Sequence, residues 1–437
     1  MKNYLLALSV SMAVAGAANA QEPIKFKFWH ALSGAQEIAV TEMCNKFNSS
    51  QDKYQVECTS YKKYDRTLQA AVAAYRVHKQ PAIVQASEVS TADMVASGTT
   101  IPYKTLMEEN GYKIDWNDFI SGVSGYYSDS NHNLQAYPFN PSTLVMYVNK
   151  TKLKAAGIQN IPETWEQAEK AMKALKGSGE DCAFGMRIDS WRHLEQLSAV
   201  HNAPIATNRN GFEGSHAKFD FNKGVEVKHI ANMKRWYDDG LMTLQGAMAG
   251  INLAQAFQSG KCAIVMDSSG RYGAAAENIK DFEWGIAKIP VYEGTVRHNA
   301  IIGGGALWTL NKLPDNVYPG VAAFYNFISS KEEQIDFSSK TGYMPNKIST
   351  IKQMEKDGSF SSKLLGGLPV IFDSLNNYET GDYNQGIRLG FFPQFRATWK
   401  TQVELVFDNQ KTPQEAMDYA AKEGNKLLER FNKTYQL

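Results

Sequence analysis

Short runs with strand periodicity alternate with helix-periodic segments along most of this chain. Residues 24–29 alternate apolar and polar side chains as a half-buried strand does, and residues 38–47 then place apolar side chains at helical spacing. Residues 54–58 return to strand alternation, and the short apolar run 82–84 follows a second helical stretch. Strands that alternate with helices favour helices packed on a largely parallel sheet. The pattern therefore predicts an α/β fold.

The same alternation starts again in the second half of the chain. Residues 144–148 form an apolar run typical of a strand, and Thr164 begins a capping box that opens the next helical segment. Residues 262–266 form another strand of the buried type, and Thr412 begins a capping box with proline at the first helical position. No internal repeat and no long flexible linker interrupts the sequence. These features favour two lobes joined by short crossovers.

The first 20 residues have the composition of an export signal. Lys2 precedes the uncharged apolar stretch 4–17, and residues 18–20 (Ala-Asn-Ala) form a signal-peptidase site that makes Gln21 the mature N-terminus. The alternative is a membrane anchor, but this stretch is shorter than the roughly 20 residues that span a bilayer, and no later segment is long enough. We therefore expect a soluble exported protein, without a lipid anchor because no cysteine adjoins the cut.

The size and charge of the mature chain limit its partners. Removing 20 residues from 437 leaves 417, which is enough for two large lobes with separate cores. Lys2 is the only charged residue removed, so the formal net charge falls from +1 to 0. A neutral chain without a basic block is a poor ligand for nucleic acid or for an anionic membrane surface.

The four cysteines are candidates for disulfides because an exported protein meets an oxidising compartment. Cys44 lies on the apolar side of a helical pattern and Cys58 in the following strand, so we expect a Cys44–Cys58 bridge. Cys182 and Cys262 form a weaker second pair, and four buried free thiols are the alternative. The cysteine spacing matches no zinc site, since there is no C-x-x-C and no nearby histidine pair.

The sequence lacks the motifs that mark common catalytic sites. There is no G-x-S-x-G elbow, no H-E-x-x-H, no phosphate-transfer loop and no dinucleotide-binding glycine motif after the first strand. The glycines at 303–305 are not followed by the lysine and hydroxyl residue of a phosphate-transfer loop. We therefore expect no enzyme activity, no cofactor and no metal, with a secreted phosphodiesterase as the alternative.

Several segments resemble the family 1 extracellular solute-binding proteins, which include the maltose-type receptors of ABC transporters. The family signature is matched by Tyr147-Val148-Asn149-Lys150, Ala156-Gly157 and Pro162-Glu163-Thr164-Trp165. Within that family the chain resembles the periplasmic receptors for glycerol 3-phosphate, and the resemblance covers essentially the whole mature chain. It is carried by segments 28–30, 124–130, 138–140, 299–304, 340–343, 386–390 and 393–396.

The resemblance implies a class II, maltose-receptor-type fold in which two hinged α/β lobes close on one ligand. The N-terminal lobe would hold residues 21–137 and 290–338, and the C-terminal lobe residues 143–287 and 342–437. The implied ligand is sn-glycerol 3-phosphate or a glycerophosphodiester such as glycerophosphocholine, with an oligosaccharide or polyol as the alternative. The implied partners are the membrane permease subunits of an ABC transporter, with the receptor a monomer in the periplasm.

The resemblance also implies a set of ligand-binding residues: Tyr64, Glu88, Ser142, Trp191, Ser268, Gly304, Tyr343 and Arg396. Their types suit a glycerol phosphate. The fork of N–H groups on Arg396 matches phosphate oxygens, and Ser268 precedes a helical stretch whose free backbone N–H groups would face an anion. Gly304 allows close approach of the backbone, and the Glu88 carboxylate accepts hydrogen bonds from glycerol hydroxyls. Arg396→Ala is then expected to abolish binding and to leave the fold intact.

These residues also have purely structural alternatives. Arg396 could form an interlobe ion pair, Ser268 could cap a helix, and the glycines at 303–305 could form a tight turn. The sequence also departs from the related receptors, which carry two tryptophans three residues apart on the glycerol side. Trp191 matches the second, whereas the first is replaced by Ile188. Phosphate recognition is expected to survive this change, while the preference among glycerol phosphates stays open.

Overall fold

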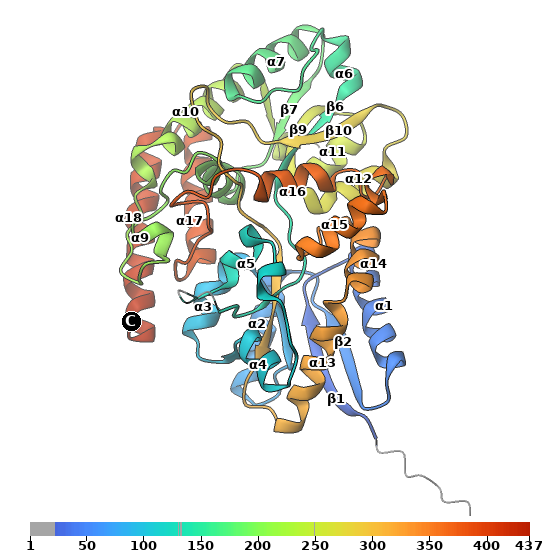
Figure 1. Cartoon of the computed structure of the whole chain (residues 1–437). Helices are drawn as coiled ribbons and strands as arrows, with labels where there is room; N and C mark the ends of the chain where they lie inside the picture. Colours follow the sequence, from blue (N-terminus) through green and yellow to red (C-terminus); the bar gives the residue numbers. More distant parts are fainter. Residues whose placement is uncertain (1–21, 130, 132, 249) are drawn as a thin grey trace, which may run out of the picture.

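The computed structural model describes residues 22–437 apart from residues 130, 132 and 249. The predicted export signal, residues 1–20, lies outside this range. Figure 1 shows two lobes, each with helices packed around a separate β-sheet, so the predicted two-lobed α/β fold is confirmed. We call the unit that contains the N-terminal sheet the first lobe and the other unit the second lobe.

The first lobe is built on a six-stranded sheet. Its strand order is β2–β1–β3–β11–β4, with β5 paired to β11. The bounds are β1 Ile24–His30, β2 Tyr54–Ser60, β3 Ile83–Ser87, β4 Thr100–Ile101, β5 Tyr137–Pro138 and β11 Gly305–Leu310. In β1, Phe26 and Phe28 are buried and Lys25 and Lys27 are exposed, so the alternation read from the sequence is confirmed.

Aromatic side chains join the helices of this lobe to its sheet. The helices are α1 Ala35–Ser50, α2 Tyr64–Arg76, α3 Thr91–Ala96, α4 Tyr103–Glu109, α5 Ser121–Tyr127, α13 Tyr318–Ile328 and α14 Lys331–Thr341. Phe47 of α1 meets Phe324 of α13 edge to face with ring centroids 5.2 Å apart, and both rings pack on Phe26. This geometry adds favourable quadrupole contacts to the burial of large apolar surfaces.

The second lobe is built on a five-stranded sheet. Its order is β10–β6–β9–β7–β8, with β6 Leu144–Asn149, β7 Cys182–Met186, β8 Met242–Leu244, β9 Cys262–Ser268 and β10 Trp284–Lys288. All six residues of β6 are buried, which explains its continuous apolar run. The helices are α6 Lys150–Ala155, α7 Trp165–Gly177, α8 Gln196–Val200, α9 Thr207–Gly211, α10 Val225–Asp238, α11 Leu253–Gln258 and α12 Tyr272–Asn278.

Four helices complete the chain: α15 Ile348–Lys356, α16 Leu368–Asn376, α17 Phe392–Phe407 and α18 Pro413–Tyr435. The last two pack against each other, and the C-terminus lies beside the first lobe (Figure 1). The capping box at Thr412 is present as predicted, with Glu415 as its reciprocal partner. Thr164 also caps α7 as expected, although Gln167 reaches back to the backbone N–H of Glu163.

The expectation of largely parallel sheets is wrong. β1 pairs in parallel with β2 and β3, and β7 with β8 and β9. However, β11 runs antiparallel to β3, β4 and β5, and β6 runs antiparallel to β9 and β10. Both exceptional strands follow a crossover between the lobes. After each crossover the chain enters the sheet from the end that faces the other lobe. The first strand after the crossover, β6 or β11, therefore runs antiparallel to its neighbours.

The two crossovers pair with each other where the lobes meet. Ser142 and Gly303 form an antiparallel bridge, in which the Ser142 N–H donates to the Gly303 carbonyl over 3.0 Å and the Gly303 N–H donates back over 2.7 Å. The Phe139 N–H likewise donates to the carbonyl of Gly305. This short two-stranded ribbon is the link on which a relative motion of the lobes would turn.

Both expected disulfides are confirmed. The Cys44–Cys58 bridge ties α1 to β2, and the Cys182–Cys262 bridge joins register partners on β7 and β9. Within the described part of the chain, no helix is both long and apolar enough to cross a bilayer. The same residues contain no group of three or more His, Cys, Asp or Glu side chains placed to hold a metal ion.

Candidate ligand-binding site

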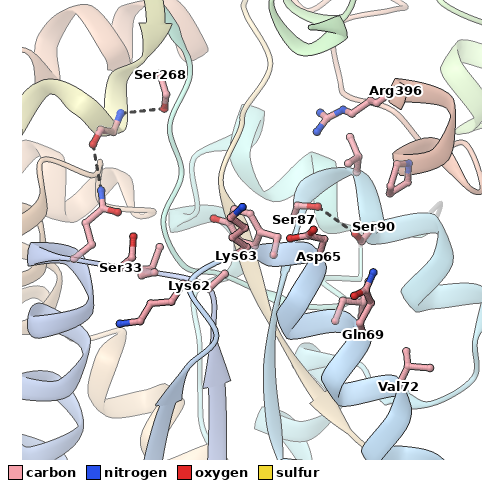
Figure 2. A pocket seen from close by; sticks show the side chains of 18 of the residues that line it. Ser33, Lys62, Lys63, Asp65, Gln69, Val72, Ser87, Ser90, Ser268 and Arg396 are labelled. Atoms are coloured by element: carbon pink, nitrogen blue, oxygen red, sulfur yellow. Dashed lines mark hydrogen bonds between the residues drawn. The ribbon is translucent and has the colours of Figure 1, made fainter. Parts of the chain in front are cut away.

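A cleft of about 1000 Å³ lies between the lobes. The first lobe contributes the loop before α1, the start of α2 and the residues after β3, and the second lobe contributes the end of β9 and the start of α17 (Figure 2). Four of the predicted ligand-binding residues line it directly: Tyr64, Ser268, Tyr343 and Arg396. The other four contact residues that line the cleft or belong to the adjacent crossover: Glu88, Ser142, Trp191 and Gly304.

Arg396 holds together two buried carboxylates, one from each lobe. Its Nη2 donates to Glu88 over 2.8 Å, and its Nε and Nη2 donate to Glu195 over 2.8 and 2.6 Å. The Glu195 side chain is fully buried and that of Glu88 is 5% exposed. Burial raises the pKa of Glu88, and the guanidinium only partly offsets this effect. With both carboxyls ionised, the formal net charge of the three side chains is −1.

This arrangement changes the expected role of Arg396. The interlobe ion pair considered as a structural alternative is present, and two carboxylates occupy most of the guanidinium fork. A ligand phosphate placed here would meet two carboxylates within 3 Å of the same cation. Ligand hydroxyl groups suit this corner better, because they donate to carboxylates and accept from a guanidinium.

Glu195 was not identified from the sequence. It ends the single π-helical turn Trp191–Glu195, and the Ser190 hydroxyl donates to its Oε1 over 2.9 Å. No motif marks this residue. The available signal was its position four residues after Trp191, which places the two side chains near the same face of a helical turn.

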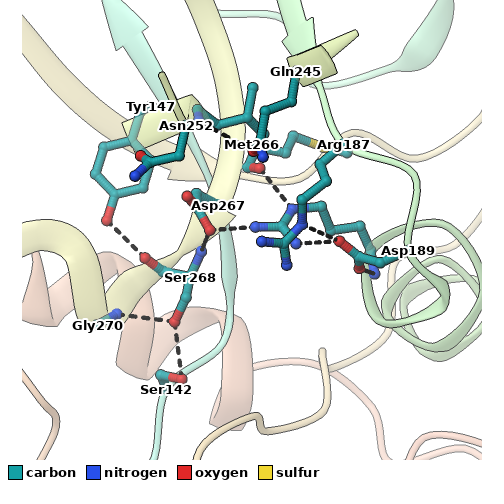
Figure 3. Close-up of polar contacts among 12 residues, drawn as sticks. Ser142, Tyr147, Arg187, Asp189, Gln245, Asn252, Met266, Asp267, Ser268 and Gly270 are labelled. Atoms are coloured by element: carbon teal, nitrogen blue, oxygen red, sulfur yellow. Dashed lines mark hydrogen bonds and ion pairs between the residues drawn. The ribbon is translucent and has the colours of Figure 1, made fainter. Parts of the chain in front are cut away.

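A second cluster in the cleft consists of neutral donors. The Ser268 hydroxyl donates to Ser142 Oγ over 3.1 Å and accepts from the Gly270 backbone N–H over 3.2 Å, while the Tyr147 hydroxyl donates to the Ser268 carbonyl (Figure 3). Ser268 is therefore the N-cap of the 3-10 turn Ser269–Arg271. This is the capping role that was considered as the structural alternative to ligand binding. The same hydroxyl still lines the cleft.

Gly304 and Trp191 shape the crossover that borders this donor cluster. Gly304 has φ +103°, and a Cβ there would stand 2.1 Å from the Asn140 carbonyl oxygen, so only glycine fits. The Trp191 indole packs on Gly303, where a Cβ would come within 2.6 Å of the ring. The Trp191 Nε1 is buried and has no hydrogen-bond partner among the described residues. It is the kind of donor that a bound ligand could satisfy.

The two predicted tyrosines also line the cleft. Tyr64 accepts a hydrogen bond from Asn140 Nδ2 over 2.9 Å. Tyr343 lies so close to Gly270 that a Cβ there would come within 2.7 Å of its ring, and it stacks on Phe337. Burial raises the pKa of both phenols, so both stay protonated near neutral pH. Each can then donate its O–H to an acceptor in the cleft.

Ile188 does not form a wall of the cleft. It is 8% exposed and packs in the hydrophobic core, whereas the preceding Arg187 lines the cleft. Arg187 donates to Asp189 over 2.8 Å (Figure 3). Asp189 also pairs with the buried Arg192. The loss of an aromatic side chain is therefore accompanied by a guanidinium at the cleft, which the sequence alone did not show.

Comparison with known proteins places this geometry in a family. The model of the family described as bacterial extracellular solute-binding protein matches residues 42–359. The sn-glycerol-3-phosphate-binding periplasmic protein UgpB of Escherichia coli strain K12 is 34% identical over 434 residues, which cover 98% of this chain and 97% of the relative. The protein of that name from Shigella flexneri is also 34% identical, with the same coverage.

Solved structures show the same fold at lower sequence identity. UgpB from Mycobacterium tuberculosis in complex with glycerophosphocholine matches with a TM-score of 0.77 at 19% identity, covering 94% of this chain and 99% of that one. The sugar-binding protein MalE from Xanthomonas citri matches with a TM-score of 0.74 at 15% identity and the same coverage. The chain belongs to the bacterial extracellular solute-binding protein family.

Proposed function

We propose that this protein is the periplasmic substrate-binding component of an ABC importer and captures sn-glycerol 3-phosphate and glycerophosphodiesters such as glycerophosphocholine. The observation that carries the proposal is the cleft, which places a hydroxyl-binding corner beside a cluster of neutral donors. Relatives that match 98% of the chain are named for binding sn-glycerol 3-phosphate. These relatives are binding proteins, which supports a role without catalysis.

The charges in the cleft favour one orientation of the ligand. The glycerol hydroxyls would lie between Glu88, Glu195 and Arg396, where carboxylate acceptors and guanidinium donors are available. The phosphate would lie at the Ser142 and Ser268 hydroxyls, since a buried dianion needs donors and is repelled by carboxylates. Arg396 would then bind the glycerol instead of the phosphate.

The remaining parts of the proposal concern export and transport. Residues 1–20 would be removed on export, and the monomeric receptor would deliver its ligand to the permease subunits of the transporter. The lobes would consist of residues 21–137 with 290–338 and residues 143–287 with 342–437. They would close by a hinge motion at the paired crossovers around Ser142 and Gly303.

A second candidate is an oligosaccharide or polyol receptor. It is favoured by the paired carboxylates beside Trp191 and by the sugar-binding proteins among the structures of the same fold. Titration calorimetry separates the two candidates. We expect heat from glycerol 3-phosphate and glycerophosphocholine and none from maltose. Binding of maltose without either glycerol phosphate would overturn the proposal, and so would the absence of heat from both glycerol phosphates.

A further inference from the structure

A second part of the cleft lies below Ser268 in the view of Figure 2, apart from Arg396. Ser33, Gln36 and the Lys62–Lys63 pair line this end from the first lobe, and Gly270 and Arg271 line it from the second. Figure 2 shows Arg396 at one side of the cleft and Ser33 with Lys62 at the other, with Ser268 above them. We call the part formed by these six residues the outer end.

The two ends of the cleft differ in charge. The Arg396 end carries two buried carboxylates on one guanidinium. At the outer end Lys62 pairs with Glu37, but Lys63 and Arg271 have no carboxylate within ion-pair distance among the described residues. Asp65 is the one acidic residue among the described residues that line the cleft, and Figure 2 shows it on the Arg396 side of Lys63. The outer end is therefore cationic and is supplied by both lobes.

If the ligand is oriented as proposed above, the outer end would contact the part of a phosphodiester that lies beyond the phosphate. With glycerol at the carboxylates and phosphate at the serines, the second alcohol of a phosphodiester leaves the phosphate towards Lys63 and Arg271. We infer that this cationic end selects the second alcohol of glycerophosphodiesters, and that neutral or anionic substituents bind more tightly than a quaternary ammonium. The inference rests on the proposed function.

Electrostatics sets the size of the expected preference. At an effective dielectric constant of about 40, two like unit charges about 6 Å apart weaken binding by roughly tenfold. Sites that favour quaternary ammonium groups surround them with aromatic faces. The outer end instead presents hydroxyl, amide, ammonium and guanidinium groups. These groups donate hydrogen bonds to polyol or carboxylate oxygens.

Calorimetry with two diesters that differ in the second alcohol tests the inference. We expect glycerophosphoglycerol to bind about tenfold more tightly than glycerophosphocholine, with glycerol 3-phosphate as the reference ligand. Arg271→Glu and Lys63→Glu should each bring this ratio to one or below. Arg66→Glu is the matched control, because Arg66 is an exposed cation of α2 that does not line the cleft, and its ratio should stay near that of the wild type.

The outcomes separate the inference from the proposed function. If glycerol 3-phosphate binds but both diesters bind equally and the two variants match Arg66→Glu, the inference is wrong and the proposed function stands. If glycerol 3-phosphate and both diesters give no heat, both are wrong. A tenfold ratio that is lost in Arg271→Glu and Lys63→Glu and kept in the control supports the inference.

Discussion

Replacing Arg396 by alanine should destabilise the fold, because Arg396 neutralises buried carboxylates from both lobes. Arg396→Ala leaves Glu195 and Glu88 buried in the cleft wall without their shared cation. Removing one partner of a buried ion pair typically costs about 3–5 kcal/mol, because the remaining charge is uncompensated. We therefore expect the free energy of unfolding at pH 7.5 to fall by about 3–5 kcal/mol. The earlier expectation that this change leaves the fold unperturbed does not follow from the structure.

The loss should depend on pH in a defined direction. Burial already raises the pKa of Glu88 with Arg396 in place, and the variant removes the group that lowers it. A carboxyl whose folded pKa lies above its unfolded value stabilises the fold below the unfolded pKa, and this contribution disappears as the pH rises through the folded pKa. The variant should thus recover part of its stability, relative to the wild type, between pH 7.5 and pH 5.

Urea unfolding followed by far-ultraviolet circular dichroism at both pH values measures this effect. The control is Glu88→Gln with Arg396→Met and Glu195→Gln, which removes all three charges and should stay within about 1–2 kcal/mol of the wild type. An Arg396→Ala protein as stable as the wild type at both pH values would refute the reasoning. Loss of ligand binding in Arg396→Ala alone would not prove a direct contact with the ligand.

Three further predictions concern the hinge, the second lobe and a lobe contact. Gly304→Ala should lower the free energy of unfolding by about 3–5 kcal/mol in urea, whereas Gly294→Ala, with φ +80° and open space around it, should cost only about 1–2 kcal/mol. Replacing Cys182 and Cys262 by alanine opens an 80-residue loop and should cost about 4 kcal/mol in the same assay. Burial raises the pKa of Asp93, which accepts a hydrogen bond from the Phe391 backbone N–H of the other lobe, to about 6. Ionising this carboxyl should cost up to about 3 kcal/mol as the pH rises from 4 to 7, so the free energy of unfolding of Asp93→Asn, measured relative to the wild type, should rise by that amount over this range.

Local patterns predicted much of the architecture. The alternation of β1, the cap at Thr412 and the Cys44–Cys58 bridge follow from residue types and short spacings, which the sequence displays directly. The Cys182–Cys262 bridge spans 80 positions and was expected only as the weaker second pair. The directions of β6 and β11 do not follow from such patterns. They depend on where the chain crosses between lobes, and that choice is made by contacts between distant segments.

The candidate site residues came from the family resemblance, which names positions in the sequence but not the partners of each side chain. Arg396, Glu88 and Ser268 were identified, yet the sequence contains nothing that pairs Arg396 with a carboxylate 201 positions away. Glu195 lies on a turn without a motif, and nothing in the sequence places Arg187 at the cleft. Which of two adjacent side chains faces a cleft depends on how the turn packs. Here Ile188 packs in the hydrophobic core and Arg187 faces the cleft.

An ion pair and a hydrogen bond cross the cleft, and both limit how a ligand can bind. The Arg396–Glu88 ion pair joins the lobes at one end, and the Gln36 side chain donates to the Gly270 carbonyl over 3.2 Å at the other. A phosphate at Arg396 would have to displace a buried carboxylate and leave it uncompensated. A hydroxyl can instead donate to Glu88 while the ion pair stays intact, so a ligand bound through its hydroxyls keeps the lobes joined at this end and adds its own contacts to theirs.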